Sequence, residues 1–400
     1  MSGPSSKFAD TFAQKVGERI PSEDDFTSEL RSPAVAARVG MWLGIAFGVC
    51  FLTGLISHYA QNPSQPIAFP TSPSWGYRVT QGLHIITGTA AIPLLLVKLW
   101  AVFPRLFRLP PRTSAGAFTV SILEKASTLA LVSSGIFMLT SGLLNSAQWY
   151  PWGFSFRPTH YALAWVAIGS LVVHIAVKLP VIRGALGADV DDTSLDRPSA
   201  VQPGILSRRG LLRSTWAAAA VAILATAGST VPLLRKVSVF AVRNGEGPQG
   251  VPINRSAEAA DIREADVGAA WALELVHGGS TMRWSLDELR ALTLRTETLP
   301  IACVEGWSAS GDWTGVRLRD LLDTVAVPAG SDLAMISLQR RGAFGETVLQ
   351  GNFADDDRTL IALELNGETL DIDHGYPARL IAPNRPGVLQ TKWLTRIEVM

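Results

Sequence analysis

Five long runs of apolar residues constrain this chain more than any other feature. They lie near 37–58, 79–103, 122–145, 160–179 and 215–234 of the 400 residues. About 20 apolar residues cross a bilayer as a helix, although one such run alone could equally be a buried helix of a soluble protein. Five of them in one chain favour an all-α transmembrane part, with a four-helix bundle and a fifth anchor helix.

The charged residues divide the chain into two parts of opposite sign. Residues 1–240 contain 20 basic and 11 acidic residues, a net charge of +9, whereas residues 241–400 contain 15 and 23, a net charge of −8. Charged residues make up only 17% of the whole chain, which is low for a soluble protein. The sequence therefore predicts a basic membrane part and an acidic domain of ordinary polarity, and we expect no nucleic-acid partner.

The loops between the apolar runs predict how the chain is oriented. The connection between the second and third runs is basic, with Lys98, Arg105, Arg108 and Arg112. The loops at 59–78 and 146–159 are nearly uncharged and hold Trp75, Tyr77, Trp149, Tyr150 and Trp152. Basic loops stay in the cytoplasm, and aromatic residues settle at the membrane surface. We therefore expect a cytoplasmic N-terminal segment at 1–36, a lipid-embedded four-helix domain at 37–179 and a cytoplasmic linker at 180–206.

The stretch that begins at Ser207, "SRRGLLRSTWAAAAVAILATAG", resembles a twin-arginine export signal. Such a signal inside a chain is explained if an exported domain has been joined to the four-helix unit and keeps its signal as the fifth helix. We therefore assign 207–236 to the signal and anchor, and 240–400 to a domain outside the cytoplasmic membrane. A plain basic flank of an ordinary anchor would also place arginines here, and Arg235 with Lys236 weaken the charge asymmetry across the run.

The chain has two cysteines, Cys50 in the first apolar run and Cys303 in the acidic domain. A lone cysteine in an exported domain is either a small buried hydrophobic residue or a functional ligand or nucleophile. Cys303 ends a short apolar stretch and is followed by a loop rich in Gly and Ser, in "LPIACVEGWSASGDWTGVRLRDLL". This context favours the functional alternative.

Five motifs of the acidic domain occur in order: "CVEGWS", "WTGVRLRDLL", "NGETL", "HGYPARL" and "KWLTRIEV". Together they resemble the molybdopterin-binding domain of the sulfite oxidase family over roughly residues 240–400. The resemblance implies a β-rich α+β fold, a Mo-molybdopterin cofactor, and molybdenum bound by the thiolate of Cys303. A thiolate is a soft ligand that suits such a metal.

The pterin of such a cofactor carries a phosphate and many hydrogen-bonding edges, so its site needs donors. In the matching motifs the candidate cofactor-binding residues are Trp313, His374, Arg379 and Lys392. Upstream, the segment "GPQGVPINRS" adds Asn254 and Arg255. The resemblance implies an arginine that helps to bind an oxyanion, and Arg255 is our candidate for that role beside Cys303 in catalysis.

Each of these assignments has a structural alternative. Lys392 could be a solvated residue beside a core tryptophan, as most lysines are exposed. Arg379 could form an ion pair with Asp371 or Asp373, and Arg255 could belong to a linker turn. His277, in an "HGG" turn, is expected to be structural.

Local patterns in the acidic domain agree with an α+β fold. Ser285 and Glu288 predict a capping box that opens the helix "SLDELRAL", and Asn366-Gly367 predicts a hairpin turn. No second β-domain follows the last motif, so we expect a monomer. Leu363 stands where the resemblance implies a tyrosine, which argues against sulfite as the substrate.

Four of the six histidines lie in the helical part: His58, His84, His160 and His174. His160 and His174 are 14 residues apart on the fourth run, about 21 Å and nearly four turns of helix, so they share one face. Histidines inside a bilayer usually face a cofactor or a pathway. The arrangement resembles b-type cytochromes of the cytochrome b561 kind and implies haem b, with His84 and His160 as the expected pair. Helix packing or a quinone site is the alternative role.

These inferences combine into one predicted function. We expect a membrane-anchored molybdenum oxidoreductase that takes an oxygen atom from a neutral sulfoxide or N-oxide, with electrons from the quinone pool through the helical unit. The net charge of −8 and Leu363 favour a neutral substrate over sulfite, a dianion that needs several cationic donors. Two alternatives stay open: a sulfite-oxidising enzyme with a soluble electron partner and purely anchoring helices, and a non-enzymatic envelope module.

Overall fold

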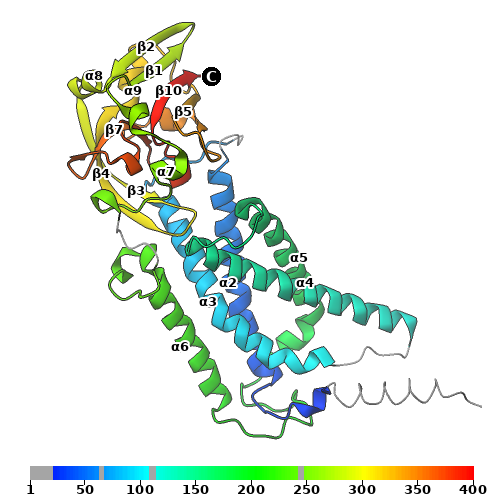
Figure 1. Ribbon diagram of the computed structural model, residues 1–400. Coiled ribbons are helices and arrows are strands. Elements are labelled where there is room, and N and C mark those ends of the chain that lie inside the picture. The colour runs from blue at the N-terminus through cyan, green and yellow to red at the C-terminus, as the bar shows by residue number, and fades with distance from the viewer. Residues whose placement is uncertain (1–20, 63–66, 108–113, 242–246) are drawn as a thin grey trace, which may run out of the picture. The chain divides into compact units, whose positions relative to one another are not determined.

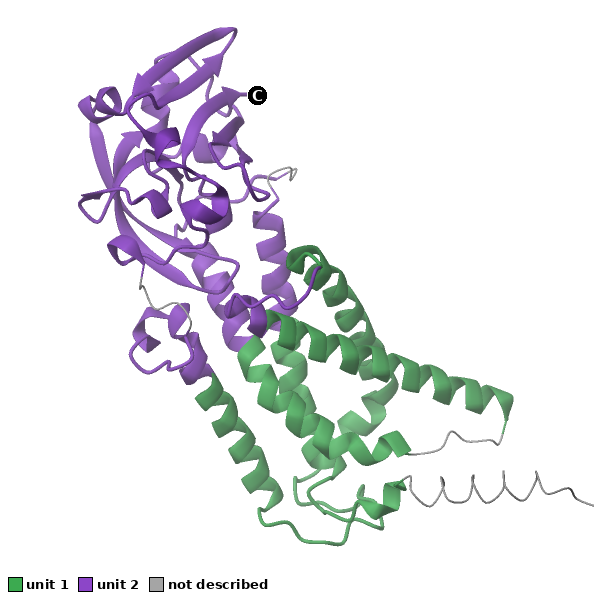
Figure 2. Cartoon of the chain, viewed as in Figure 1, with its two compact units in different colours: residues 1–48, 88–142, 154–222 green, residues 49–87, 143–153, 223–400 purple. Residues whose placement is uncertain are grey.

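The computed structural model describes residues 21–62, 67–107, 114–241 and 247–400 (Figure 1). The chain divides into two compact units, which Figure 2 shows in different colours. Unit 1 comprises residues 1–48, 88–142 and 154–222, and unit 2 comprises residues 49–87, 143–153 and 223–400. The boundary passes through several long helices, so each unit contains parts of them.

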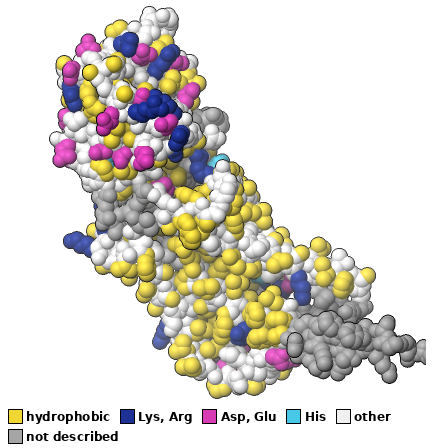
Figure 3. All heavy atoms as spheres, viewed as in Figure 1, with side chains coloured by type: hydrophobic (Ala, Val, Ile, Leu, Met, Phe, Trp, Pro, Cys, Tyr) yellow, Lys and Arg dark blue, Asp and Glu magenta, His cyan; other side chains and the backbone are white. Residues whose placement is uncertain are grey.

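Five long helices account for the apolar runs of the sequence. They are α2 (Pro33–Ala60), α3 (Gly76–Val102), α4 (Ala115–Ser146), α5 (Phe156–Gly187) and α6 (Arg208–Thr226). Within the described residues, these five are long and apolar enough to cross a membrane. In Figure 3 hydrophobic side chains gather over the helical part, whereas charged side chains concentrate on the β-rich part. The prediction of five apolar helices is confirmed.

α5 is longer than the predicted span 160–179. It continues through Pro180 and ends at Gly187, so the segment that connects it to α6 starts at Ala188 rather than at 180. An internal proline removes one backbone hydrogen bond, but packing of the later turns compensates for that loss. Ala185 in those turns is buried, and its carbonyl oxygen accepts a hydrogen bond from Arg38 at 2.9 Å.

α6 ends at Thr226, earlier than the predicted end of the fifth run at 234. Two 3-10 turns follow, η3 (Ala227–Ser229) and η4 (Pro232–Leu234). The N–H of Gly228 donates to Ser238 Oγ at 2.8 Å, and a Cβ added at this glycine would lie 2.5 Å from Ser238 Cβ. The chain therefore folds back on itself here instead of continuing the helix.

Polar contacts at helix ends and a small apolar core hold unit 1 together. Arg38 on α2 donates to the carbonyl oxygens of Ala185 and Ala188 at 2.9 and 2.6 Å. Lys98 on α3 donates to the carbonyl oxygen of Ala36 at 2.8 Å. The apolar core consists of Val35, Val39 and Leu94, with Leu43, Val97, Leu211 and Leu212 packed against it.

The two arginines of the signal-like segment bind the acidic segment that precedes α6. Arg208 forms an ion pair with Asp196, and both side chains are nearly buried. Arg209 pairs with Asp189 at 2.8 Å and with Asp191 at 2.9 Å. The Arg209 pairs are exposed, so they contribute little to stability. Both arginine charges are thus neutralised by aspartates of the connecting segment.

Two five-stranded sheets form the β-rich part of unit 2. One has the order β2 (Ser280–Ser285), β1 (Ala272–His277), β10 (Leu394–Val399), β5 (Leu333–Ser337) and β6 (Glu346–Leu349). The other has the order β3 (Leu294–Ala302), β4 (Ser308–Arg317), β7 (Leu360–Leu365) and β8 (Glu368–Thr369), with β9 (Arg379–Ile381) paired to β7. β1 and β10 are parallel, and the other pairs are antiparallel.

One short helix, α7 (Ala257–Ala260), precedes the strands, and three connect them: α8 (Leu286–Ala291), α9 (Leu318–Asp323) and α10 (Gly351–Ala354). The predicted capping box is present, because Ser285 Oγ accepts the N–H of Glu288 at 3.3 Å and Glu288 Oε2 accepts the N–H of Ser285 at 2.7 Å. The predicted hairpin joins β7 to β8, with Asn366 and Gly367 at φ +53° and +82°. The β-rich α+β prediction is confirmed.

Within unit 2, ends of the long helices contact loops of the β-rich part. The hydrogen bonds join Tyr77 to Asn384, Arg78 to Ser308 and Asn145 to Val304. Ala60, Tyr77 and Ala302 form a small buried cluster. Because Ala302 directly precedes Cys303, these contacts bring the ends of α2 and α3 close to the candidate site.

Candidate functional site

Cys303 directly follows β3 and opens the turn that joins β3 to β4. Its backbone N–H donates to the carbonyl oxygen of Trp307 at 2.9 Å, and its own carbonyl oxygen accepts the N–H of Gly306 at 3.0 Å. Gly306 has φ +89°, a left-handed conformation that disfavours residues with a side chain. The turn therefore fixes the cysteine backbone, and the Cys303 side chain is buried in one apolar cluster with Trp307 and Trp313.

A narrow recess, with a cavity volume of about 10 Å³, lies beside this turn. It is lined by Pro252, Ile253, Asn254, Ile301, Trp307, His374, Arg379, Gly387 and Lys392. Ile301 and Trp307 lie on either side of Cys303 in sequence, and the other residues come from the segments 252–254 and 374–392. The fold thus brings together three of the five motifs that the sequence singled out, and four of the predicted cofactor-binding residues.

Arg379 begins β9 with its side chain buried. Its guanidinium donates to the carbonyl oxygens of His374 at 2.9 Å and Gln390 at 3.3 Å, and it lies 4.9 Å from the centroid of the Trp313 ring. Its Nε is buried and has no hydrogen-bond partner. Burial lowers the pKa of Arg379 to about 9, so the group is still charged at neutral pH.

Lys392 is also buried, with only 9% of its surface exposed, so the solvated alternative is wrong. Its amino group donates to the carbonyl oxygen of Asp373 at 2.9 Å and to that of Arg255. Gly375, at φ +106°, makes room for it, because a Cβ there would lie 2.8 Å from Lys392 Cβ. Burial, and then the charge of Arg379, hold the pKa of Lys392 well below its ordinary value.

His374 is a neutral hydrogen-bond donor in this site. Its Nε2 lies 2.8 Å from the carbonyl oxygen of Pro248, which can only accept, so the proton sits on Nε2. Burial, followed by the charge of Arg379, lowers the pKa of His374 to about 4. The ring is therefore uncharged at neutral pH and ties the segment before the recess to η7 (Ile372–His374).

Arg379 and Lys392 are buried cations without acidic partners. Among the described residues, no carboxylate forms an ion pair with either, so the alternative pairing of Arg379 with Asp371 or Asp373 is wrong. Asp371 instead accepts the backbone N–H of Asp373 at 2.8 Å, and Asp373 accepts that of Ala257 at 2.6 Å. Buried uncompensated charge costs free energy, and a bound anion would relieve that cost.

These residues fit a molybdopterin. The phosphate of the cofactor is an anion that the two buried cations and the partnerless Nε of Arg379 can bind. Cys303 forms no disulfide, so its sulfur can serve as a metal ligand. In the described part of the chain, no group of three or more His, Cys, Asp or Glu side chains is placed to hold a metal ion. A molybdenum at Cys303 would therefore take its remaining ligands from the cofactor.

Three further predicted residues lie at different depths around the recess. Asn254 lines it. The guanidinium of Arg255 donates to the carbonyl oxygen of Ala259 at 2.5 Å, and its Nε is buried without a partner. Trp313 is fully buried behind the recess, where its indole N–H donates to the carbonyl oxygen of Leu299 at 3.3 Å. Trp313 therefore supports Arg379 instead of forming part of the recess wall.

Five lining residues were not predicted: Pro252, Ile253, Ile301, Trp307 and Gly387. Trp307 lies in the "CVEGWS" motif, and its indole N–H donates to Glu305 at 3.0 Å. Its position in that motif is the signal that could have found it. A Cβ at Gly387 would lie 3.1 Å from the carbonyl oxygen of Ala302, so a glycine lets the two segments approach closely.

Leu363 does not face the recess. Successive residues of a strand point to opposite faces of the sheet. Ala362 belongs to the apolar cluster that contains Cys303, whereas Leu363 belongs to the main core cluster together with Leu275 and Ile397. Leucine at this position therefore does not bear on the charge of the substrate.

The predicted haem-ligand histidines are distributed over both units. They are His58 on α2 and His84 on α3 in unit 2, and His160 and His174 on α5 in unit 1. His84 Nδ1 lies 3.1 Å from Thr53 Oγ1 and 3.0 Å from the carbonyl oxygen of Cys50, so α2 orients the ring. His160 Nδ1 lies 3.2 Å from Ser141 Oγ. The pairing of His84 with His160 around a haem stays a prediction.

Comparison with known protein families agrees with the geometry of the recess. Residues 259–400 match the family model described as the oxidoreductase molybdopterin-binding domain. The C-terminal part of the chain is therefore a molybdopterin-binding oxidoreductase domain of the sulfite oxidase type, as the motifs predicted. Asn254 and Arg255 lie just before the matched residues.

Individual proteins resemble shorter stretches of the chain. It is 30% identical over 140 residues to the "Putative protein-methionine-sulfoxide reductase subunit YedZ1" of Azospira oryzae, a match that covers 35% of this chain and 52% of that protein. It is 33% identical over 113 residues to the sulfite oxidase of Arabidopsis thaliana, covering 24% of this chain and 29% of that one. The chain thus spans about half the length, or less, of these curated relatives.

One solved structure shows a limited likeness. The crystal structure of the sulfane dehydrogenase SoxCD from Paracoccus pantotrophus matches 33% of this chain and 38% of its own chain. The two are 22% identical, with a TM-score of 0.30.

Proposed function

We propose that this chain is a membrane-anchored molybdenum-dependent oxidoreductase that removes an oxygen atom from a neutral sulfoxide or N-oxide outside the cytoplasm. The observation that carries the proposal is the recess beside Cys303, where Arg379 and Lys392 are buried without acidic partners. When bound there, molybdopterin supplies a molybdenum centre that exchanges one oxygen atom with the substrate in a two-electron step.

The side chains around the recess have distinct roles in this proposal. Cys303 provides the thiolate ligand, and Arg379 and Lys392 bind the anionic end of the cofactor. His374 stays neutral and holds the upstream segment, which presents Asn254 to the pterin edge. Arg255, whose Nε has no partner, orients the oxygen-bearing substrate.

Two observations support reduction of a neutral oxide. The domain at 241–400 has a net charge of −8, which disfavours the approach of a dianion such as sulfite. The similarity to a protein described as a protein-methionine-sulfoxide reductase subunit makes methionine sulfoxide the first substrate to test. The thioether oxide is uncharged, so it meets no repulsion from the acidic surface.

Sulfite oxidation is the second candidate, and a specific observation favours it. The chain is 33% identical to a sulfite oxidase over 113 residues. Two cations, Arg379 and Lys392, stand at the recess and would attract a small anion if the cofactor does not neutralise them. In this version a soluble partner takes the electrons and the helices serve only as an anchor.

The electron supply is proposed to be the quinone pool, through a haem b that His84 and His160 ligate. The fixed orientation of the His84 ring by Thr53 and Cys50 supports a ligand role. His84→Ala or His160→Ala should remove a reduced b-type absorption band from membranes, whereas His277→Ala, on a turn of the β-rich part, should not. Wild-type membranes without such a band, from cells supplied with haem, would rule the haem out.

A direct comparison of turnover tests the direction of the reaction. The purified full chain is assayed with reduced dye and methionine sulfoxide, and separately with sulfite and a dye acceptor. We expect the sulfoxide reaction to be the faster by at least tenfold. Faster sulfite oxidation would overturn the proposed direction and leave the molybdopterin assignment in place.

A further inference from the structure

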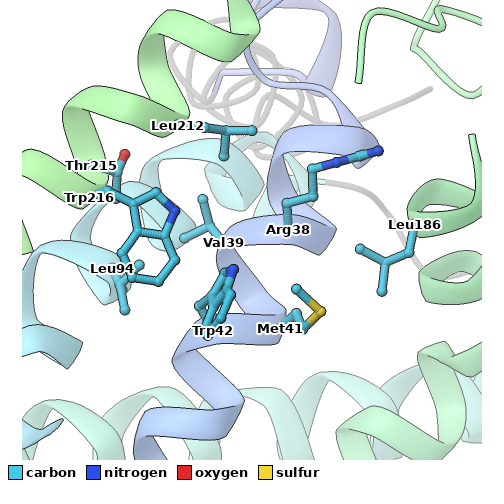
Figure 4. Close-up of a pocket in the computed structure, with 9 residues that line it drawn as sticks. All are labelled: Arg38, Val39, Met41, Trp42, Leu94, Leu186, Leu212, Thr215 and Trp216. Atoms are coloured by element: carbon cyan, nitrogen blue, oxygen red, sulfur yellow. The ribbon is translucent and has the colours of Figure 1, made fainter. Parts of the chain in front are cut away.

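Unit 1 contains a cavity of about 380 Å³ between its long helices. Figure 4 shows the residues that line it: Arg38, Val39, Met41, Trp42, Leu94, Leu186, Leu212, Thr215 and Trp216. They come from α2, α3, α5 and α6. The volume falls within the range of roughly 300–1,000 Å³ that is typical of small-molecule sites.

Two tryptophans form the aromatic wall of this cavity. Trp42 on α2 and Trp216 on α6 meet edge to face, with ring centroids 4.7 Å apart and planes at 85°. In Figure 4 both indole nitrogens lie on the cavity side of their rings. Within the described residues, neither indole N–H donates a hydrogen bond. Trp42 and Trp216 are 42% and 41% exposed, so their N–H groups are available to a ligand with acceptor oxygens.

The basic residue that lines the cavity, Arg38, already has hydrogen-bond partners. The Arg38 guanidinium donates to the carbonyl oxygens of Ala34, Ala185 and Ala188 at 3.2, 2.9 and 2.6 Å, so it points toward the end of α5. Its aliphatic stem lines the cavity instead, and no acidic residue is among the lining residues. The cavity therefore favours an uncharged ligand over the phosphate of a lipid headgroup.

We propose that this cavity binds the ring of an isoprenoid quinone or quinol. The two ring oxygens would accept hydrogen bonds from the indole N–H groups of Trp42 and Trp216, and the apolar residues would contact the ring faces. Met41 and both tryptophans are partly exposed to the surroundings of the helices, which gives the isoprenoid tail a way into the lipid. The inference rests on the proposed function in that the quinone pool is the electron source.

Binding of decyl-ubiquinone to the full-length protein in nanodiscs tests the site. The double variant Trp42→Phe/Trp216→Phe keeps both aromatic rings and removes both donors, so we expect the dissociation constant to rise by about tenfold or more. Thr215→Leu extends a lining side chain into the cavity and should weaken binding by a similar factor. Trp165→Phe is the matched control on α5, outside the cavity, and should bind as the wild type does.

Equal affinity in the wild type and in both cavity variants would overturn the inference. So would displacement of the quinone analogue by an anionic phospholipid added in equal amount, because the cavity would then be a lipid site. Dye-driven reduction of methionine sulfoxide is measured on the same preparations. Turnover without saturable quinone binding contradicts the quinone site alone, and quinone binding without turnover contradicts the proposed function alone.

Discussion

Asn384, in the β-rich part of unit 2, caps the N-terminus of α3. Its Oδ1 accepts the backbone N–H of Tyr77 at 2.5 Å, and its Nδ2 donates to the carbonyl oxygen of Pro70 at 2.7 Å. The first N–H groups of a helix have no partner within the helix, so a side chain that accepts from one of them stabilises the helix end. Asn384 lies three residues before Gly387 of the recess, and His84 lies farther along α3. The contact therefore ties the candidate cofactor site to the helix that carries a candidate haem ligand.

Replacing Asn384 with leucine should destabilise this junction. The variant removes both hydrogen bonds and leaves the buried N–H of Tyr77 unpaired, which we expect to lower the free energy of unfolding by about 2 kcal/mol. Thermal unfolding of the detergent-solubilised full chain measures the change. Asn352→Leu is the matched control, because Asn352 donates to the carbonyl oxygen of Phe69 at 2.8 Å from an exposed position. Equal losses of unfolding free energy in the two variants would show that the Asn384 cap contributes no more than an exposed hydrogen bond.

Cys303→Ala should abolish turnover while the domain stays folded. Alanine is smaller and apolar, so it fits the buried position but offers no thiolate to a metal. We expect turnover below about one hundredth of the wild-type rate together with loss of bound molybdenum, measured by elemental analysis of the purified full chain. Cys50→Ala, which changes the other thiol of the protein, should leave both measurements unaltered. Wild-type turnover in Cys303→Ala would contradict the ligand role.

Lys392→Met should stabilise the cofactor-free protein and weaken binding of the cofactor. In protein from a host that makes no molybdopterin, the variant removes a buried charge without an acidic partner and should raise the free energy of unfolding by about 1 kcal/mol. In a cofactor-replete host, it should lower the pterin content, because an anion loses one of its two cations. Arg396→Met on β10 is the control, because this half-buried arginine is already paired with Glu398. Unchanged pterin content would argue against phosphate binding by Lys392.

Most of the fold could be predicted because local sequence patterns determine its helices and turns. Apolar runs specify helices wherever they occur, and the Asn366-Gly367 pair specifies its hairpin through backbone conformation alone. The extension of α5 past Pro180 could not be predicted, because it depends on packing of Ala185 against another helix. Tertiary contacts therefore determine where α5 ends, although Pro180 alone would predict an earlier end.

The site was predictable where polar residues or motifs mark it. Arg379 and Lys392 stand out as polar residues in apolar motifs, and the structure brings both to one recess. Ile301 and Gly387 carry no such mark, since their role is to shape the wall. The face of Leu363 was not predictable either, because a one-residue shift in strand register exchanges the two faces of a strand.

Because of His374, the stability of unit 2 should fall as the pH decreases. Burial and the charge of Arg379 lower its pKa from its ordinary value of 6.5 to about 4 in the folded state. The unfolded chain therefore takes up a proton between pH 6.5 and pH 4 that the folded chain refuses, and stability falls as the pH decreases through that window. The full loss is roughly 3 kcal/mol. His374→Gln can keep the bond to Pro248 and should flatten the thermal unfolding profile between these pH values, whereas His277→Gln should not.

Export of the C-terminal domain should depend on the arginine pair itself and not on its charge. Arg208→Lys/Arg209→Lys keeps both charges, but lysine lacks the planar guanidinium that a twin-arginine pathway would recognise. We expect protease added to intact cells to spare residues 240–400 in this variant and to digest them in the wild type.

The arginines also bind Asp189, Asp191 and Asp196, so loss of these ion pairs is a competing explanation. Asp196→Asn breaks the buried pair without touching the arginines, and it should leave the domain digestible. Digestion of the lysine variant at the wild-type rate would make the segment an ordinary anchor, and protection in Asp196→Asn would assign the effect to the ion pairs instead.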